Sequence, residues 1–184
     1  MIVAIRHGQT AWSLARRHTG RTDVPLTDAG REEARAIAPR IAGREFAAVY
    51  ASPLSRAHET ARLAGLEPEL DDDLMEWDYG AYDGMTTAAV REARPGWLLW
   101  RDGCPGGESP DDVAARVDRV IARAIATEGD TCLVAHSHLL RMLATRWLEQ
   151  PHEFGARLPL ATASVSELGW DREHRALRRW SATA

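Results

Sequence analysis

The first apolar run of the chain ends in polar side chains that could do chemistry. Residues 2–5 are all apolar and are followed directly by Arg6, His7 and Gly8. An arginine and a histidine at the end of a buried strand are costly to desolvate unless an anion balances their charge. We therefore expect an anionic ligand to bind where this run ends.

Two further apolar runs, at 47–51 and 131–135, end in the same kinds of side chain. In open α/β sheets, ligands bind beyond the carboxyl ends of the strands. The polar residues that the three runs place there are Arg6 and His7, Ser52 followed by Arg56, and His136 followed by Ser137. Arginines and histidines without a carboxylate predict an anion site.

These residue types are suited to binding and attacking phosphate. Arginine binds phosphate oxygens through two parallel hydrogen bonds, and the helix N-termini expected after Ser52 and His136 add amide donors. Positive neighbours disfavour imidazolium, so a histidine near two arginines stays neutral and nucleophilic. We expect His7 to attack phosphorus. The charge on the other phosphate oxygens would be balanced by Arg6, Arg56 and His136.

Such a reaction needs an acid for the departing alkoxide, and the same group can later accept a proton from water. Glu76 is a candidate because it lies among the aromatic residues of the stretch MEWDYGAYDG, where burial would favour its protonated form. Asp78 and Asp83 in the same stretch are alternatives that the sequence leaves open.

Hydrophobic periodicity predicts the elements that position these residues. Continuous apolar runs at 2–5, 47–51 and 131–135 are typical of strands buried on both faces. Helical spacing and capping residues predict helices at 27–41, 52–63, 86–93, 109–127 and 138–148, and alternation at 165–180 predicts a hairpin at the sheet edge. We expect one three-layer α/β/α domain over 1–184 with a mostly parallel sheet. The loop-rich insertion at about 66–108 is expected to wall the pocket.

Composition limits the classes of partner. The chain has 184 residues, 45% of them hydrophobic, and its formal net charge of −4 disfavours a nucleic-acid surface. It has no apolar stretch long enough for a membrane span, so a cytoplasmic protein that binds a small molecule is expected. All 23 basic residues are arginine. Two cysteines, Cys104 and Cys132, are too few for a disulfide framework.

Three other features have structural interpretations. His136 and His138 suit zinc, but a third ligand of the right kind is missing nearby, so no metal is expected. His138 is expected to line the pocket or to support the residues that line it. The acidic run 71–73 is expected to be a solvated turn, and the tryptophans at 77, 97 and 100 are expected in the core.

Five motifs together resemble those of the histidine phosphatase superfamily, phosphoglycerate mutase-like branch. They are RHGQT at 6–10, HTGRTDVPLTDAG at 18–30, SPLSRAHETA at 52–61, EWDYGAYDG at 76–84 and VAHSHLLRML at 134–143. Their order and spacing agree over nearly the whole chain. The resemblance implies the fold of that family, a single histidine phosphatase domain, and catalysis without a metal or organic cofactor.

The resemblance also implies roles for individual residues. His7 would be the phosphorylated nucleophile and Glu76 the proton donor and acceptor, with Arg6, Arg56 and His136 as the phosphate pocket. The residues that stand where the family contacts substrate or phosphate, or on the loop after the nucleophile, are Thr10, Ser13, Thr19, Gly20 and Tyr79.

Two positions depart from the common family pattern. Ser13 stands where many members have asparagine, but RHGQT-x-WS together with WRDGC and GGES at 100–109 resembles a subgroup that includes sedoheptulose 1,7-bisphosphatase. Ser137 replaces a common glycine, and its side chain would either narrow the pocket or donate a further hydrogen bond to phosphate.

The expected activity is hydrolysis of a small phosphorylated metabolite, a sugar phosphate or bisphosphate, through a phosphohistidine. A phosphoglycerate mutase and a catalytically silent phosphate-binding module are the alternatives. Arg91, Arg94 and Arg101 of the insertion could lie near the pocket mouth and meet a second phosphate or a carboxylate, or they could equally belong to the solvated surface. The hairpin edge at 165–168 could pair with a second subunit in a homodimer.

Overall fold

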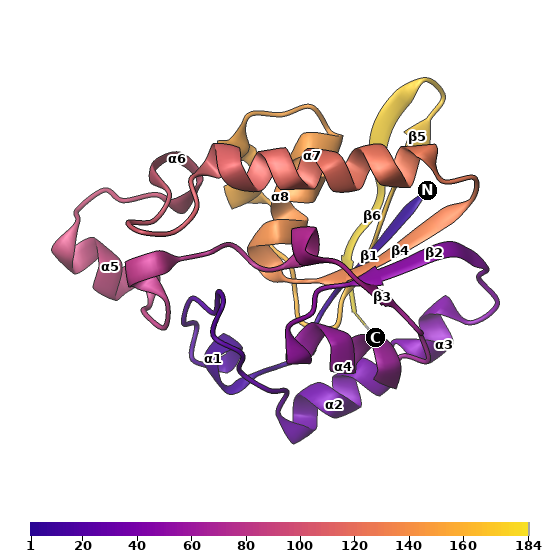
Figure 1. The fold of residues 1–184 in the computed structure, drawn as a ribbon, viewed down its shortest axis with the longest axis horizontal. Helices are drawn as coiled ribbons and strands as arrows, with labels where there is room; N and C mark the ends of the chain where they lie inside the picture. Colours follow the sequence, from indigo (N-terminus) through magenta and orange to yellow (C-terminus); the bar gives the residue numbers. More distant parts are fainter. Residues whose placement is uncertain (184) are drawn as a thin grey trace.

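A six-stranded sheet forms the centre of the molecule, in the order β3-β2-β4-β1-β5-β6 (Figure 1). The computed structural model describes residues 1–183. The strands are β1 Ile2–Arg6, β2 Phe46–Ala51, β3 Glu69–Leu70, β4 Asp130–Ala135, β5 Val165–Asp171 and β6 His174–Ala182. The first four are parallel, whereas β5 and β6 form an antiparallel hairpin at one edge. The expected mixed sheet with a C-terminal edge hairpin is confirmed.

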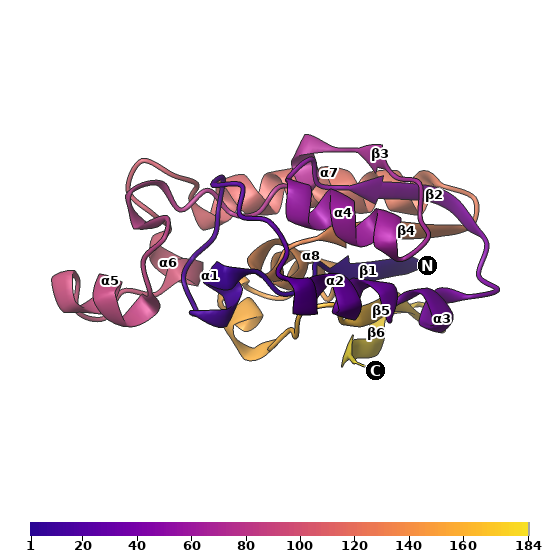
Figure 2. The same ribbon diagram turned by 90° about the horizontal axis from the view of Figure 1, so that it is seen from below.

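Helices cover both faces of the sheet and complete the three layers (Figures 1 and 2). One face is covered by α7 Pro110–Ala126 and α8 Ser137–Trp147. The other face is covered by α2 Asp28–Arg35, α3 Ala38–Ile41 and α4 Ser55–Leu63. Ile2 and Ala4 of β1 pack into the core under α7 and α8, while Val3 and Ile5 pack into the core under the other helices. Alternate residues of β1 therefore enter different cores, which is why its apolar run is continuous.

The helix expected at 27–41 is two helices. Its N-cap is confirmed, because the Thr27 hydroxyl accepts from Gly30 N at 3.0 Å. α2 ends at Arg35, however, and α3 begins at Ala38. Pro39 has no N–H to donate to the Arg35 carbonyl and its ring crowds that turn, so a continuous helix cannot form.

The helix expected at 52–63, with Ser52 as its N-cap, begins two residues later than expected, and Leu54 is at the N-cap position. α4 starts at Ser55, and the Ser52 hydroxyl accepts from Leu54 N at 3.3 Å in the turn that precedes it. Ser52 is therefore not the N-cap. The other expected helices agree with α5 Thr87–Ala93, α7 and α8, and Ser109 forms a capping box with Asp112 at the start of α7.

Residues 66–108 contain β3, α5, α6 (Leu99–Asp102) and two 3-10 turns at Asp72–Leu74 and Gly80–Tyr82. In both views α5 and α6 extend beyond the end of the sheet (Figures 1 and 2). The segment is anchored by its tryptophans at 77, 97 and 100, which are buried in the same core as α7 and α8, as expected. Cys104 and Cys132 are also buried and unpaired.

Candidate active site

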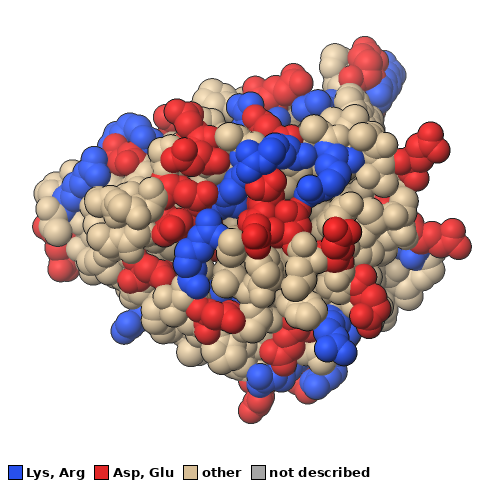
Figure 3. All heavy atoms as spheres, in the orientation of Figure 1, with Lys and Arg blue, Asp and Glu red and all other residues tan. Residues whose placement is uncertain are grey.

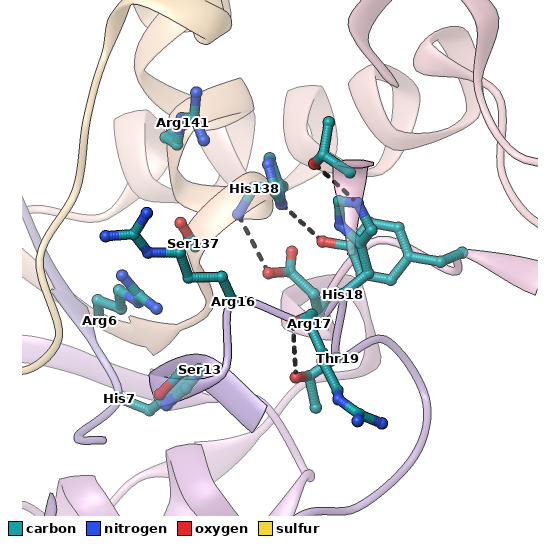
Figure 4. A pocket seen from close by; sticks show the side chains of 13 residues that line it. Arg6, His7, Ser13, Arg16, Arg17, His18, Thr19, Ser137, His138 and Arg141 are labelled. Carbon is teal, nitrogen blue, oxygen red and sulfur yellow. Dashed lines mark hydrogen bonds between the residues drawn. The ribbon is translucent and has the colours of Figure 1, made fainter. Parts of the chain in front are cut away.

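A cavity of about 330 Å³ opens where β1 and β4 end, between α8, the loop around α1 (Ala11–Leu14) and the 66–108 segment (Figure 4). Its lining residues are Arg6, His7, Ser13, Arg16, Arg17, His18, Thr19, Glu76, Tyr79, Thr87, Ser137, His138 and Arg141. Four of them are arginines, and Glu76 is the one carboxylate. The cavity is thus suited to an anion and carries a single candidate acid.

His7 follows β1 and is held in one orientation. Arg6 pairs with Ala135 in the parallel register, which brings His7 to the level of His136 at the end of β4, with ring centroids 5.1 Å apart. The His7 side chain is buried, and its Nδ1 lies 2.7 Å from the Gly8 carbonyl. Because a carbonyl only accepts, Nδ1 carries the proton and Nε2 keeps its lone pair.

Glycine is required beside this histidine. A Cβ on Gly8 would lie 2.2 Å from the carbonyl oxygen of Gly30, at the start of α2. This close backbone approach allows Gly8 N to donate to the Thr60 hydroxyl on α4 at 3.1 Å. The loop that carries His7 is therefore clamped between α2 and α4.

The electrostatics of the site keep His7 neutral. Burial, and then the positive charges of Arg6 and Arg56, hold the pKa of His7 well below its usual value. Burial and Arg56 lower the pKa of His136 in the same way. The imidazole of His7 therefore remains neutral at neutral pH, with a free lone pair on Nε2 that can act as a nucleophile.

Arg56 and His136 lie beneath the cavity and do not line it. Arg56 is fully buried; its Nε donates to Nδ1 of His136 at 3.2 Å, and its terminal nitrogens donate to the carbonyls of Thr19, Gly20 and Thr22. Nε2 of His136 consequently carries the ring proton.

Nε2 of His136 donates a hydrogen bond to the Ser52 hydroxyl oxygen at 2.8 Å. This contact explains why Ser52 is turned away from the start of α4. The sequence placed Ser52 at the end of a strand, beside the predicted site, and this position indicates a role there. The expected role as a helix cap would instead have paired Ser52 with the main chain of α4.

Glu76 is buried, and three main-chain amides point at its carboxylate. Oε1 accepts from Trp77 N at 3.0 Å and from Leu139 N at 2.9 Å, while Oε2 accepts from His138 N at 3.1 Å. Two of these donors belong to the N-terminus of α8, whose dipole favours a carboxylate there. The alternatives Asp78 and Asp83 do not line the cavity. Asp83 instead binds Gly20 N at 2.8 Å, and Asp78 binds Gly80 N at 2.9 Å.

The other predicted site residues divide into two groups. Ser13, Thr19, Tyr79 and Ser137 line the cavity. Thr10 is buried and caps α1 through reciprocal hydrogen bonds with Ser13. Gly20 is buried beside the cavity, where a Cβ would lie 2.8 Å from the Trp77 carbonyl oxygen.

Of the two interpretations of Arg91, Arg94 and Arg101, the solvated surface agrees with the structure and a place at the pocket mouth does not. Arg91 donates to the Trp97 carbonyl and Arg101 pairs with Asp102, so neither faces the cavity, and Arg94 does not line it either. The arginines that do are Arg16, Arg17 and Arg141. Arg141 lies one turn after Ser137 on α8, and this i, i+4 spacing is the signal that could have identified it.

His18 and His138 also line the cavity, each with a hydroxyl partner. The Tyr79 hydroxyl lies 2.6 Å from Nδ1 of His138, as dashed in Figure 4, and Thr87 Oγ1 lies 3.2 Å from Nε2 of His18. The expectation that His138 lines the pocket is confirmed. Burial, and then the charge of Arg141, holds the pKa of His138 well below its usual value.

Comparison with known proteins agrees with this geometry. The family model described as histidine phosphatase superfamily (branch 1) matches residues 2–183. An acid phosphatase of Mycobacterium tuberculosis is 42% identical over 182 residues, covering 96% of this chain and 89% of its own. Sedoheptulose 1,7-bisphosphatase of Saccharomyces cerevisiae is 34% identical over 179 residues, covering 79% and 66%. The solved structure of mycobacterial glucosyl-3-phosphoglycerate phosphatase complexed with VO3 has a TM-score of 0.87 and 32% identity, covering 99% and 98%.

Proposed function

The chain belongs to branch 1 of the histidine phosphatase superfamily, and from that membership we propose that it hydrolyses small phosphorylated sugar-type metabolites through a phosphohistidine at His7. The observation that carries the proposal is the state of His7. Its Nδ1 is fixed by the Gly8 carbonyl, its Nε2 is free to attack, and burial together with two nearby arginines keeps the ring neutral. In this proposal residues 1–184 form one domain, and the 66–108 segment forms a wall of its pocket.

In the first step, Nε2 of His7 forms a bond to phosphorus while the bond from phosphorus to the substrate oxygen breaks. Arg6 lines the cavity and Arg56 lies beneath it, and in this proposal their positive charges stabilise the negative oxygens of the transition state. His136 is neutral and assists by turning its Nε2–H from the Ser52 hydroxyl to a phosphoryl oxygen. Glu76 in its protonated form gives its proton to the departing oxygen.

In the second step, water forms a bond to phosphorus while the phosphorus–nitrogen bond breaks, and the Glu76 carboxylate takes the proton from that water. Oε2 accepts one main-chain amide whereas Oε1 accepts two. Oε2 is therefore the oxygen better able to carry the proton in both steps. No metal or organic cofactor enters this proposed cycle.

The direct test is phosphate release from an aryl phosphate and from a panel of sugar phosphates, with chelator present. His7→Ala should abolish release, whereas His174→Ala, on the exposed hairpin, should retain it. Glu76→Gln should slow both steps. With an aryl phosphate, whose phenoxide leaves with little help from an acid, hydrolysis should be slowed more than formation, so an acid-labile, alkali-stable phosphohistidine should accumulate.

Release that persists in His7→Ala would contradict the proposal. Transfer of the phosphoryl group between substrate hydroxyls without release would indicate a mutase. Binding of substrate without either reaction would indicate a silent module.

A further inference from the structure

His7 and His136 are supported by different kinds of group. Nδ1 of His136 accepts from Arg56 Nε at 3.2 Å, and Nε2 of His136 donates to the Ser52 hydroxyl at 2.8 Å. Nδ1 of His7 instead donates to the Gly8 carbonyl at 2.7 Å. The support of His136 is thus a cation and a neutral hydroxyl, whereas the support of His7 depends on what lies behind one peptide group.

The peptide group between Gly8 and Gln9 joins His7 to a carboxylate. Its carbonyl accepts from Nδ1 of His7, and its N–H, on Gln9, donates to Oε2 of Glu33 at 2.8 Å. A peptide group is a resonant unit, so a negative partner at its N–H makes its oxygen a stronger acceptor. The charge of Glu33 therefore strengthens the hydrogen bond that holds the His7 ring.

The start of α2 fixes Glu33 in this position. Thr27 N donates to the Gln9 carbonyl at 2.9 Å, and the Thr27 hydroxyl donates to Oε1 of the Gln9 side chain at 3.0 Å. Gly30 makes this approach possible, because a Cβ there would lie 2.1 Å from the Gln9 carbonyl oxygen. Glu33 follows Gly30 by three residues and so lies on the same face of the helix. The helix thus places a carboxylate beside Gln9 N.

Glu33 forms no ion pair, although arginines are plentiful in this chain. On the face shown in Figure 3, acidic and basic side chains are interspersed, and an acid such as Asp73 pairs with Arg119. Within residues 1–183, the Glu33 carboxylate has no basic group within ion-pair distance. Its charge is therefore directed at the Gln9 amide and is not cancelled by a direct cationic partner.

Attack on phosphorus gives this support a purpose. When Nε2 of His7 forms its bond to phosphorus, both ring nitrogens carry a substituent and the ring becomes positively charged. Burial, and then the positive charges of Arg6 and Arg56, disfavour a positive charge on this ring. A carboxylate linked to the ring through two successive hydrogen bonds offsets part of that cost.

We propose that Glu33 is a positioning residue that supports the attack of His7 through the peptide group between Gly8 and Gln9. It strengthens the hydrogen bond at Nδ1, keeps Nε2 as the unprotonated nitrogen and stabilises the charged ring of the phosphohistidine. The bonds formed and broken are those of the first step, and the proton on Nδ1 stays in place. This proposal rests on the proposed function, because it assigns a further residue to that step.

The test follows the two steps in single turnovers, with the protein in excess over 4-nitrophenyl phosphate. Release of 4-nitrophenol measures formation of the phosphohistidine, and release of inorganic phosphate measures its hydrolysis. Glu33→Gln keeps an acceptor for Gln9 N but removes the charge. Formation should slow by about fivefold or more. The lag of phosphate behind 4-nitrophenol should not lengthen, because a less stabilised ring is a better leaving group in hydrolysis.

Glu32→Gln is the matched control. It removes the same charge from the neighbouring position of α2, where Glu32 is exposed and pairs with Arg35, and formation should stay within about twofold of the wild-type rate. A second readout is the magnetic resonance signal of the His7 Nδ1 proton, which His7→Ala assigns by its loss. That signal should move upfield in Glu33→Gln, since a weaker hydrogen bond deshields the proton less, and should stay in place in Glu32→Gln.

Formation at the wild-type rate in Glu33→Gln, or an unshifted Nδ1 signal, would overturn the role of Glu33 alone. Equal slowing in Glu32→Gln would also overturn it, because any charge on α2 would then suffice. A longer lag in Glu33→Gln would do the same, since it would indicate a general loosening of the loop. A wild-type protein that releases no 4-nitrophenol, or a His7→Ala variant that still releases it, would instead contradict the proposed function.

Discussion

At the scale of single residues, the site places charged arginines beside a histidine that stays neutral. Burial lowers the pKa of His7 most, and the arginines that would bind phosphate, Arg6 and Arg56, lower it further and so help to keep the nucleophile neutral. Arg56 has the additional task of orienting His136 through Nδ1. Arg56 therefore supplies three things: a positive charge, a planar guanidinium with paired donors, and an Nε–H that orients His136.

Two substitutions of Arg56 should separate these contributions. Arg56→Lys keeps the charge but loses the fork, so kcat/KM for an aryl phosphate should fall by roughly 100-fold while the acid limb of the pH profile stays in place. Arg56→Gln also removes the charge that depresses the pKa of His7. That pKa should rise, and the acid limb should move to higher pH. Acid limbs that coincide in the two variants would contradict this assignment.

At the scale of elements, α7 fixes the stretch that carries Glu76. Arg116 of α7 is buried and donates to the carbonyls of Asp73, Met75 and Glu76 while pairing with Glu108. Glu108 in turn accepts from Asp78 N at 2.8 Å, and its carbonyl accepts from the Trp77 ring at 2.9 Å. A helix of the outer layer thereby positions the proposed acid from behind.

Arg116→Met should therefore affect both stability and catalysis. It leaves the partly buried Glu108 with only the longer contact to Arg21, and it leaves three carbonyls without their donor. The free energy of unfolding should therefore fall by about 3 kcal/mol in chemical denaturation. The proposed proton transfers should slow because Glu76 is less well held, which lowers kcat more than it raises KM. The matched control is Arg146→Met on α8, which breaks a largely exposed pair with Asp118 and should cost under about 1 kcal/mol. Equal losses in the two variants would refute this role of Arg116.

Some of the strands, helices and site residues could be predicted from the sequence, and others could not. Apolar runs and caps located β1, β2 and β4 and most helices, because these signals are local. The two-residue strand β3 was not predicted, because it is too short to show a pattern. The helix predicted at 27–41 overlooked Pro39, although a proline is a local signal. Ser52 was misinterpreted because its partner His136 is 84 residues away. Arg16 and Arg141 were missed for the same reason: a side chain becomes part of a cavity only when distant segments meet, and single-sequence patterns do not report that meeting.

At the scale of the whole molecule, buried neutral histidines link stability to pH. The pKa values of His7, His136 and His138 all lie well below the ordinary value, chiefly because the rings are buried. In the unfolded chain these rings bind protons below about pH 6.5, whereas in the folded protein they remain neutral. The stability that they contribute is therefore present above that pH and is lost as the pH falls.

We expect each ring to lower the free energy of unfolding by about 1.4 kcal/mol per pH unit below pH 6. Denaturant titrations at pH 7.5, 6 and 5 measure this slope. His138→Gln removes one of the three rings and should reduce the slope by the contribution of one proton. A slope that does not change in that variant would contradict the linkage.

The two buried cysteines offer a practical route to the motion of the pocket loop. Burial raises the pKa of Cys104 and of Cys132 to about 12, so neither supplies the thiolate that alkylating reagents need. Leu14 of α1, next to the pocket residues Ser13 and Arg16, is 67% exposed. A single cysteine introduced by Leu14→Cys would thus be the reactive thiol of a protein whose native thiols are silent. A fluorophore or spin label attached there would report directly whether the loop closes when a phosphorylated ligand enters.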